Sequence, residues 1–144
     1  MRLLSEVVKS GGGGTPSKKN VKCWGGTIPW VSPKDMKFEV ITTSQDKITE
    51  VAIKESSAKI VNSGTLLIVV RSGILARTIP VAKSGCTLTV NQDLKTILPS
   101  KILGSNYLYY YFLNKEGELL SKVTRGATVH RIQTEVLKNL QIPV

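Results

Sequence analysis

Cationic and amide side chains are concentrated in one glycine-rich segment near the start of the chain, Gly11 to Asp35. Glycines and prolines interrupt the segment throughout, and it also carries both tryptophans. Because these residues break helices, we expect loops here, with only Thr27 to Ser32 able to pair as a short strand. The polar residues among the breakers are Lys18, Lys19, Asn20, Lys22 and Lys34. Lysines on a tightly turned backbone are suited to neutralising the charges of a polyanion.

Net charge supports the same chemistry. The chain has 20 Lys and Arg against 10 Asp and Glu, a formal charge of +10 and a pI near 9.8. No acidic residue occurs from Ser56 to Gln92, a stretch that holds Lys59, Arg71, Arg77 and Lys83. This one-sign stretch indicates an anionic partner, and nucleic acid is favoured over a membrane surface and over charge that only aids solubility.

Motifs for catalysis and for metal binding are missing. His130 is the only histidine, and no GxSxG, HExxH, paired-carboxylate, P-loop or GxGxxG motif is present. Cys23 and Cys86 lack the CxxC spacing of a zinc site, so we expect two free thiols. The sequence therefore predicts a protein that is not an enzyme, with no catalytic residue, no metal and no cofactor.

The cellular compartment can be predicted from hydropathy. Leu66 to Val70 is the longest apolar run and is far too short to cross a bilayer. The first ten residues lack the long apolar region and the cleavage site of a secretory signal. We therefore expect a cytoplasmic protein.

The candidate binding residues are cations and small polar side chains that the sequence places in loops. Lysine and arginine position a protein on phosphates, whereas Asn, Gln, Ser and Arg can reach base edges in the major groove. The predicted DNA-binding residues are Ser17, Lys18, Lys19, Asn20, Lys22, Lys34, Arg71, Ser72, Arg77, Asn91 and Gln92.

Structural roles remain open for several of these residues. Asn20 could shape a turn, Asn91 and Gln92 could cap the end of a strand, and Arg77 could lie along a sheet. Trp24 and Trp30 could stack on bases. Because Ile28 and Val31 are close in sequence to the tryptophans, we favour tryptophans that anchor the loop to a sheet.

The elements needed to position these residues fit one domain over 1–144, of class α+β. We expect a curved mixed or antiparallel β-sheet with several short helices. The predicted strands are Thr27 to Ser32, Phe38 to Thr42, Leu66 to Val70, Arg77 to Val81, Thr87 to Val90, Lys95 to Leu98 and Ala127 to Ile132. Turns are predicted at Arg71 to Gly73, Lys83 to Gly85 and Asn91 to Asp93. The predicted helices are Thr49 to Lys54 with Thr49 as N-cap, Asn106 to Leu113 with Ser105 as N-cap, Glu118 to Val123, and Thr134 to Asn139.

Two sequence blocks resemble a known family. Gly14 to Ser17 (GTPS) and Trp24 to Asp35 (WGGTIPWVSPKD) are similar in letters and spacing to the target recognition domain of the specificity subunit of type I restriction-modification systems. Further similar blocks follow in order: Ile48-Thr49, Gly64 to Ile68, Arg71 to Gly73, Asn91-Gln92, Tyr107 to Tyr110, Gly126 to Thr128, and Leu137 to Pro143. The resemblance spans almost the whole chain.

The resemblance implies a non-catalytic reader of double-stranded DNA. In the family each such domain reads one half of a split target, modification subunits methylate adenine, and restriction subunits cleave. The chain ends at Pro143-Val144, so we expect a single target recognition domain without the spacer helix and the second recognition domain. The alternative is a basic interaction module that reads no sequence, or a regulatory or decayed half-subunit.

Overall fold

The order of elements alternates short strands with short helices throughout residues 1–144, all of which the computed structural model describes. The strands are β1 (Arg2–Leu3), β2 (Lys9–Gly12), β3 (Trp24–Val31), β4 (Val40–Ile41), β5 (Asp46–Ile48), β6 (Leu66–Val69), β7 (Arg71–Ser72), β8 (Val81–Ser84), β9 (Thr89–Val90), β10 (Leu94–Leu98), β11 (Thr124–Arg125), β12 (His130–Arg131) and β13 (Gln141–Ile142). The α-helices are α1 (Leu4–Val7), α2 (Glu50–Glu55), α3 (Ser105–Asn114), α4 (Glu116–Ser121) and α5 (Thr134–Lys138), and the 3-10 helices are η1 (Val21–Cys23), η2 (Pro33–Asp35) and η3 (Gly73–Ala76).

The largest sheet has five strands in the order β2-β10-β6-β8-β4. Neighbouring strands are antiparallel except β4 and β8, which are parallel. At its centre β6 is buried along its whole length, because four consecutive apolar residues can bury both faces of a strand. This confirms the predicted strand at Leu66 to Val70.

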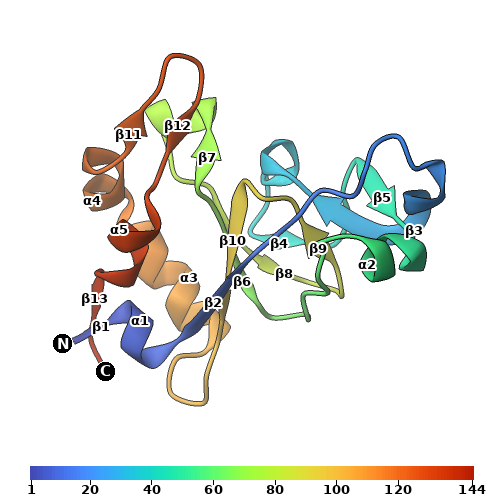
Figure 1. Ribbon diagram of the computed structural model, residues 1–144. Helices are drawn as coiled ribbons and strands as arrows, with labels where there is room; N and C mark the ends of the chain where they lie inside the picture. The colour runs from blue at the N-terminus through green and yellow to red at the C-terminus, as the bar shows by residue number, and fades with distance from the viewer.

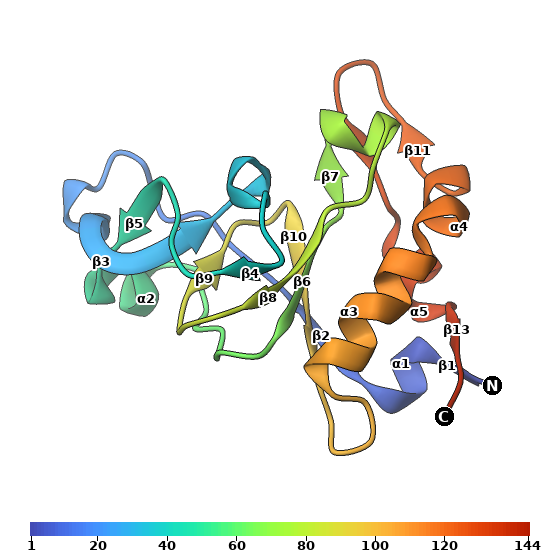
Figure 2. The same cartoon turned by 180° about the vertical axis from the view of Figure 1, so that it is seen from behind.

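The class α+β with a mixed sheet and several short helices is confirmed. The structure contains three smaller sheets in addition: β1-β13, β11-β12-β7 and β5-β3-β9 (Figures 1 and 2). Their strands are only two to eight residues long, and several pair segments that are far apart in the sequence, such as β1 with β13 and β7 with β12.

Strand β3 is longer than the predicted Thr27 to Ser32 and begins at Trp24. A β-bulge lies between Trp24 and Ile28, where Gly25 has φ of 78°, a conformation that glycine adopts without steric cost. Pro29 is tolerated because the pairing of β3 with β9 starts only at Trp30, so the missing N–H of Pro29 leaves that ladder intact.

Two hydrophobic cores support these sheets. The larger includes 28 buried residues and lies between the five-stranded sheet and the helices, with α3 packed on β6 and β8. The smaller consists of Cys23, Trp30, Ile48, Ala52 and Ala58, beneath β3, β5 and α2. Figure 1 shows the second core's elements as a separate lobe beside the five-stranded sheet.

Several predicted boundaries are wrong. Arg71 to Gly73 forms strand β7 and the start of η3 instead of a plain turn, and the strand predicted from Arg77 begins at Val81. The turn predicted at Lys83 to Gly85 is mostly strand, because β8 continues through Ser84. These segments pair with distant parts of the chain, which local turn signals do not reveal.

Helix starts were predicted with mixed success. Thr49 caps α2 as expected, and its side chain accepts a hydrogen bond from the Ala52 N–H at 3.4 Å. Gly104, not Ser105, caps α3, and Gln133 caps α5 without a side-chain bond. No helix combines the length and the apolar character needed to span a bilayer.

Candidate nucleic-acid interface

The predicted loop leaves the end of β2 through glycines that touch other backbone. A Cβ on Gly13 would lie 2.1 Å from the Val90 carbonyl oxygen, and the Gly14 N–H donates to that same oxygen at 3.2 Å. Only glycine fits this close approach. The start of the loop is therefore fixed against the strand that precedes Asn91.

The two tryptophans anchor the loop, as expected from the sequence. The indole N–H of Trp30 donates to the Gly14 carbonyl oxygen, and that of Trp24 donates to the Ser17 carbonyl oxygen, both at 3.0 Å. The rings meet edge to face with centroids 5.1 Å apart, a favourable aromatic arrangement. The Lys18 ammonium lies 5.9 Å from both ring centroids, near the outer limit of a cation–π contact.

The anchored loop presents its cations to solvent. Ser17, Lys18, Lys19 and Lys22 are all exposed. Asn20 does not share this freedom, because its Oδ1 accepts from the Lys22 N–H at 3.1 Å and its Nδ2 donates to Glu55 at 3.2 Å. The side chain of Asn20 therefore shapes η1, the structural role left open by the sequence.

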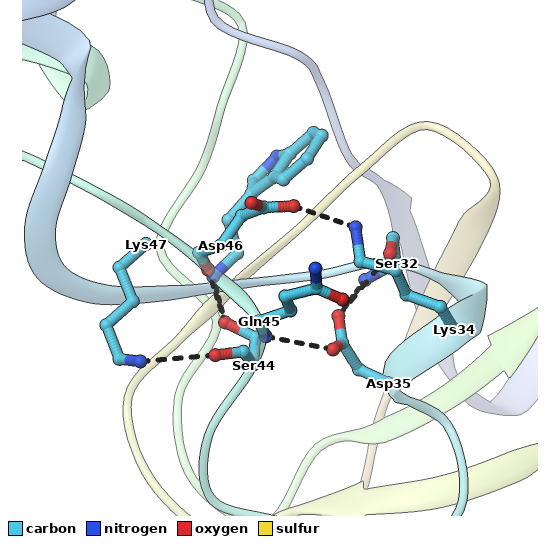
Figure 3. A network of polar contacts seen from close by, with 8 residues as sticks. Ser32, Lys34, Asp35, Ser44, Gln45, Asp46 and Lys47 are labelled. Atoms are coloured by element: carbon cyan, nitrogen blue, oxygen red, sulfur yellow. Dashed lines mark hydrogen bonds and ion pairs between the residues drawn. The ribbon is translucent and has the colours of Figure 1, made fainter.

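Lys34 belongs to a polar network that closes the neighbouring loop (Figure 3). Asp35 accepts from the Ser32 N–H and from the Gln45 N–H, each at 3.0 Å. The Lys34 ammonium contacts Asp46 at 2.7 Å. Lys34 is thus exposed but already paired, and its charge is largely balanced.

A second group of predicted residues lies on β7 and η3. Arg71 and Arg77 are exposed. The Arg71 Nε lies 4.0 Å from an Asp93 carboxylate oxygen, and an exposed pair at that separation contributes little. The Ser72 hydroxyl accepts from the Ile74 N–H at 3.3 Å and so caps η3.

Asn91 and Gln92, at the corner after β9, differ in exposure and in hydrogen bonding. Asn91 is only 7% exposed, and its Oδ1 accepts from the Asp93 N–H at 2.9 Å. This Asx-type contact builds the turn. Gln92 is exposed, its Oε1 accepts a hydrogen bond from the Thr15 hydroxyl, and its amide nitrogen has no protein partner.

Backbone contacts join the two groups into one surface. The N–H groups of Val70 and Arg71 donate to the Asp93 carbonyl oxygen at 2.8 and 3.3 Å, and Thr15 reaches Gln92 from the glycine-rich loop. The turn 91–93 therefore lies between the loop 13–22 and strand β7. We call the exposed residues of these three segments the cationic surface. In Figures 1 and 2 β7 and the β2–β3 loop both lie in the upper half of the view, on opposite sides of β9 and β10.

Two arginines of this region were not predicted from the sequence. On strand β12, Arg131 lies directly opposite Arg71 of β7. In the neighbouring row, His130 of β12 lies between Ser72 of β7 and Arg125 of β11. Both arginines are exposed. Directly opposed like charges disfavour a strand pair, and an anion bound near Arg71 and Arg131 would reduce this cost. Little in the sequence indicated the hairpin of β11 and β12, because only the turn at Gly126 marks it.

Perturbed pKa values lie away from the cationic surface. Burial, with Glu118 and Tyr107 nearby, raises the pKa of Tyr111 to about 12. Hydrogen bonds from Lys115 and Lys122 lower the pKa of Glu118. These groups belong to helices α3 and α4, where packing and surface ion pairs explain them. No cluster of three or more His, Cys, Asp or Glu side chains could hold a metal ion, and both cysteines are free thiols, as predicted.

The chain is a basic α+β protein with a cationic surface, and comparison with known proteins identifies its family. The family model described as "Type I restriction modification DNA specificity domain" matches residues 1–144, so the chain belongs to this family. The resemblance noted in the sequence is confirmed.

Specificity subunits from two organisms align with almost the whole chain. It is 37% identical over 145 residues to the EcoR124I/EcoR124II specificity subunit of Escherichia coli, covering 99% of the chain and 36% of the relative. It is 35% identical over 147 residues to the MjaIX specificity subunit of Methanocaldococcus jannaschii, covering 99% of the chain and 33% of the relative. The chain thus spans about a third of the length of these relatives.

Solved structures show the same fold. The HsdS subunit from Thermoanaerobacter tengcongensis superposes with a TM-score of 0.68 at 22% identity, over 96% of this chain and 31% of that one. The type I S subunit from M. genitalium gives a TM-score of 0.66 at 14% identity, over 96% and 32%. At these identities the likeness establishes the fold alone.

Proposed function

We propose that this domain binds double-stranded DNA and reads one half of a split target for a type I restriction-modification complex. The observation that carries the proposal is the cationic surface, in which Thr15 joins the anchored loop to Gln92 and the Asp93 carbonyl oxygen joins the same turn to Arg71 of β7. Membership of the DNA specificity family supports the same reading.

The surface residues divide into two roles. Lys18, Lys19 and Lys22 are exposed and make no ion pair, so they are suited to phosphates. Arg71, Arg77 and Gln92 carry the donor and acceptor groups that read base edges in the major groove. Ser17 and Ser72 contribute smaller contacts, and Lys34 contributes less because Asp46 holds it. Asn20 and Asn91 act by shaping the surface.

The complex supplies the chemistry. Both relatives are specificity subunits of type I restriction enzymes, and we propose that adenine methylation and cleavage belong to the modification and restriction subunits with which this domain works. Within that complex residues 1–144 act as one target recognition domain, in the cytoplasm, with no catalytic group and no cofactor of their own.

A binding titration against salt tests the electrostatic part. If about five phosphates are contacted, the logarithm of the affinity falls against the logarithm of salt concentration with a slope of roughly −4 to −5. Replacing Lys18 and Lys19 together by alanine should reduce that slope by about 2. The matched control is Lys101→Ala, in the loop before α3, which should leave it unchanged. A flat salt response would contradict the proposal.

Selection from random duplexes tests the reading of sequence. The folded domain should enrich one half-site, with and without a modification subunit. The second candidate is a basic module that reads no sequence, and the internal bonds of Asn20 and Asn91 favour it, because they remove two amides from base contact. Enrichment of no half-site, with equal losses for every sequence when Arg71 or Gln92 is replaced, would support this second candidate.

A further inference from the structure

Three adjoining hollows surround helix α1. One of about 460 Å³ is lined by residues of α1, β2, β10 and α5. The second, of about 350 Å³, and the third, of about 480 Å³, lie against the other sides of α1 and the 98–103 loop. They share lining residues, Ser5 and Lys9 between the first and third, Glu6 and Ser100 between the second and third. We call this continuous concave region the α1 belt.

The belt is cationic. Its lining includes Arg2, Lys9, Lys95, Lys101 and Lys138. Only Lys138 has an acidic neighbour, Glu135 at 4.0 Å, and the other four cations form no ion pair. The one acid in the lining is Glu6, whose carboxylate is occupied by the Leu3 N–H at 2.9 Å. The belt therefore offers unbalanced positive charge to whatever covers it.

The same region has an apolar floor and an apolar rim. Leu4, Ile97 and Leu137 are buried at the base of the first hollow. At the rim, Ile102 is 75% exposed. A surface that combines exposed apolar side chains with cations marks an interaction site.

Strand β2 contributes a free edge to the belt. It is the outermost strand of the five-stranded sheet and pairs only with β10. Alternate residues of an edge strand direct backbone N–H and C=O groups away from their partner. At Gly11 and Gly12 no side chain shields these groups, so another backbone can approach them.

The belt extends from helix α1 to Gly12 and Lys95, which adjoin the loop 13–22 and the turn 91–93. In Figures 1 and 2 helix α1, both termini and the 98–103 loop are at one end of the molecule, and the β11–β12 hairpin is at the other. The part of the belt around α1 and the 98–103 loop is therefore distant from the β11–β12 hairpin.

We propose that the α1 belt binds an acidic amphipathic segment of a partner protein. The carboxylates of that segment pair with Lys9, Lys95 and Lys138, and its apolar side chains fill the hollow over Ile97 and Leu137. A protein segment fits better than nucleic acid, because a phosphate backbone has no apolar groups for this floor. The proposal does not depend on DNA binding by the cationic surface.

A synthetic amphipathic helix of leucine and glutamate is the first probe. We expect it to shift the amide resonances of Ser5, Val8, Gly11 and Gly12 in the isotope-labelled full chain, and not those of residues 17–22. The same helix with lysine in place of glutamate should not bind. Oligo-glutamate, which lacks the apolar face, should bind at least about tenfold more weakly, a difference of about 1.4 kcal/mol.

Variants separate this site from the DNA surface. Replacing Lys9 and Lys95 together by alanine should weaken the leucine-glutamate helix about tenfold with no change in DNA binding, whereas the pair Lys18→Ala and Lys19→Ala should do the reverse. Ile102→Ser, at an exposed position that tolerates a polar residue, should weaken the peptide alone. The proposal is overturned if the peptide fails to bind, if oligo-glutamate binds equally well, or if duplex DNA displaces the peptide from the belt.

Discussion

At the residue scale, the decisive distinction is between polar side chains that the fold uses and those that it leaves free. Asn20 and Asn91 have similar local sequence signals to Gln92, yet both are engaged in turns. Gln92 keeps a free amide nitrogen on the surface, held in place through Thr15. The same amide chemistry therefore supports the structure at two positions and is available for a ligand at the third.

Substitution at the corner should separate these roles. We expect Gln92→Ala to leave thermal stability unchanged and to reduce discrimination at one base position about tenfold, since a good amide–base contact is worth about 1–3 kcal/mol. Asn91→Ala should instead lower the free energy of unfolding by about 1 kcal/mol, because it leaves the turn without its hydrogen bond. Thermal melts and selection from random duplexes measure the two effects. Loss of base preference in neither variant would exclude this corner from reading.

Gly13 offers a second test at this scale. Alanine there would place its Cβ against the Val90 carbonyl oxygen, so the loop must move away from the sheet. We expect a loss of about 1–3 kcal/mol in the free energy of unfolding and weaker binding to all DNA sequences. Gly117→Ala is the control, because nothing lies within 4 Å of its added Cβ. A Gly13→Ala domain with normal stability would contradict the close approach.

At the scale of elements, the three-stranded sheet β11-β12-β7 combines an unfavourable pairing with an exposed position. Arg71 and Arg131 are directly opposite one another, and the neighbouring row holds Ser72, His130 and Arg125. The opposed like charges disfavour this pairing in the free protein, whereas a DNA phosphate would accept charge-assisted hydrogen bonds from arginine side chains here. In this sheet, the positive charges that favour DNA binding should therefore lower the stability of the folded protein.

Arg131→Gln tests this conflict. We expect the variant to be more stable than the parent by about 0.2–1 kcal/mol, since a like-charge pair is removed, and to bind DNA more weakly with a salt slope smaller by about 1. Denaturant unfolding and the salt titration measure the two quantities. The control Lys101→Gln removes one positive charge elsewhere and should change neither. A less stable variant with unaltered DNA binding would show that Arg131 has only a structural role.

At the scale of the whole molecule, the two ends of the chain are tied to helix α3. Strands β1 and β13 pair, and the Tyr111 hydroxyl donates to the Gln141 carbonyl oxygen at 2.6 Å. Burial raises the pKa of Tyr111 from its ordinary value of 10.0 to about 12. The folded protein therefore favours the neutral phenol.

The sign of the pH dependence follows from that raised pKa. Because the folded value lies above the unfolded one, the stabilisation is fully present below about pH 10 and is lost as the pH rises toward 12. Tyr111→Phe removes this dependence. We expect the difference in melting temperature between the parent and Tyr111→Phe to be constant from neutral pH to about pH 10 and to narrow above it. A difference that stays constant through the alkaline range would show that the phenol is not buried in this way.

Much of the architecture could be predicted because it depends on local patterns. The continuous apolar run of β6, the Thr49 cap of α2, the anchoring tryptophans and the two free thiols were all anticipated. The blocks around Gly14 and Trp24 were enough to identify the family that the comparisons establish. Each of these features depends on residues close together in the chain or on composition.

The remaining features depend on pairings between distant segments. Pairing between β7 and β12 places Arg71 opposite Arg131. Asn91 is buried and its Oδ1 accepts from the Asp93 N–H, so its side-chain amide is removed from the surface. The sequence by itself determined that this is a basic α+β domain of the specificity family. Only the tertiary structure decided which cations and amides remain free, because a side chain's availability depends on the partners that folding brings to it.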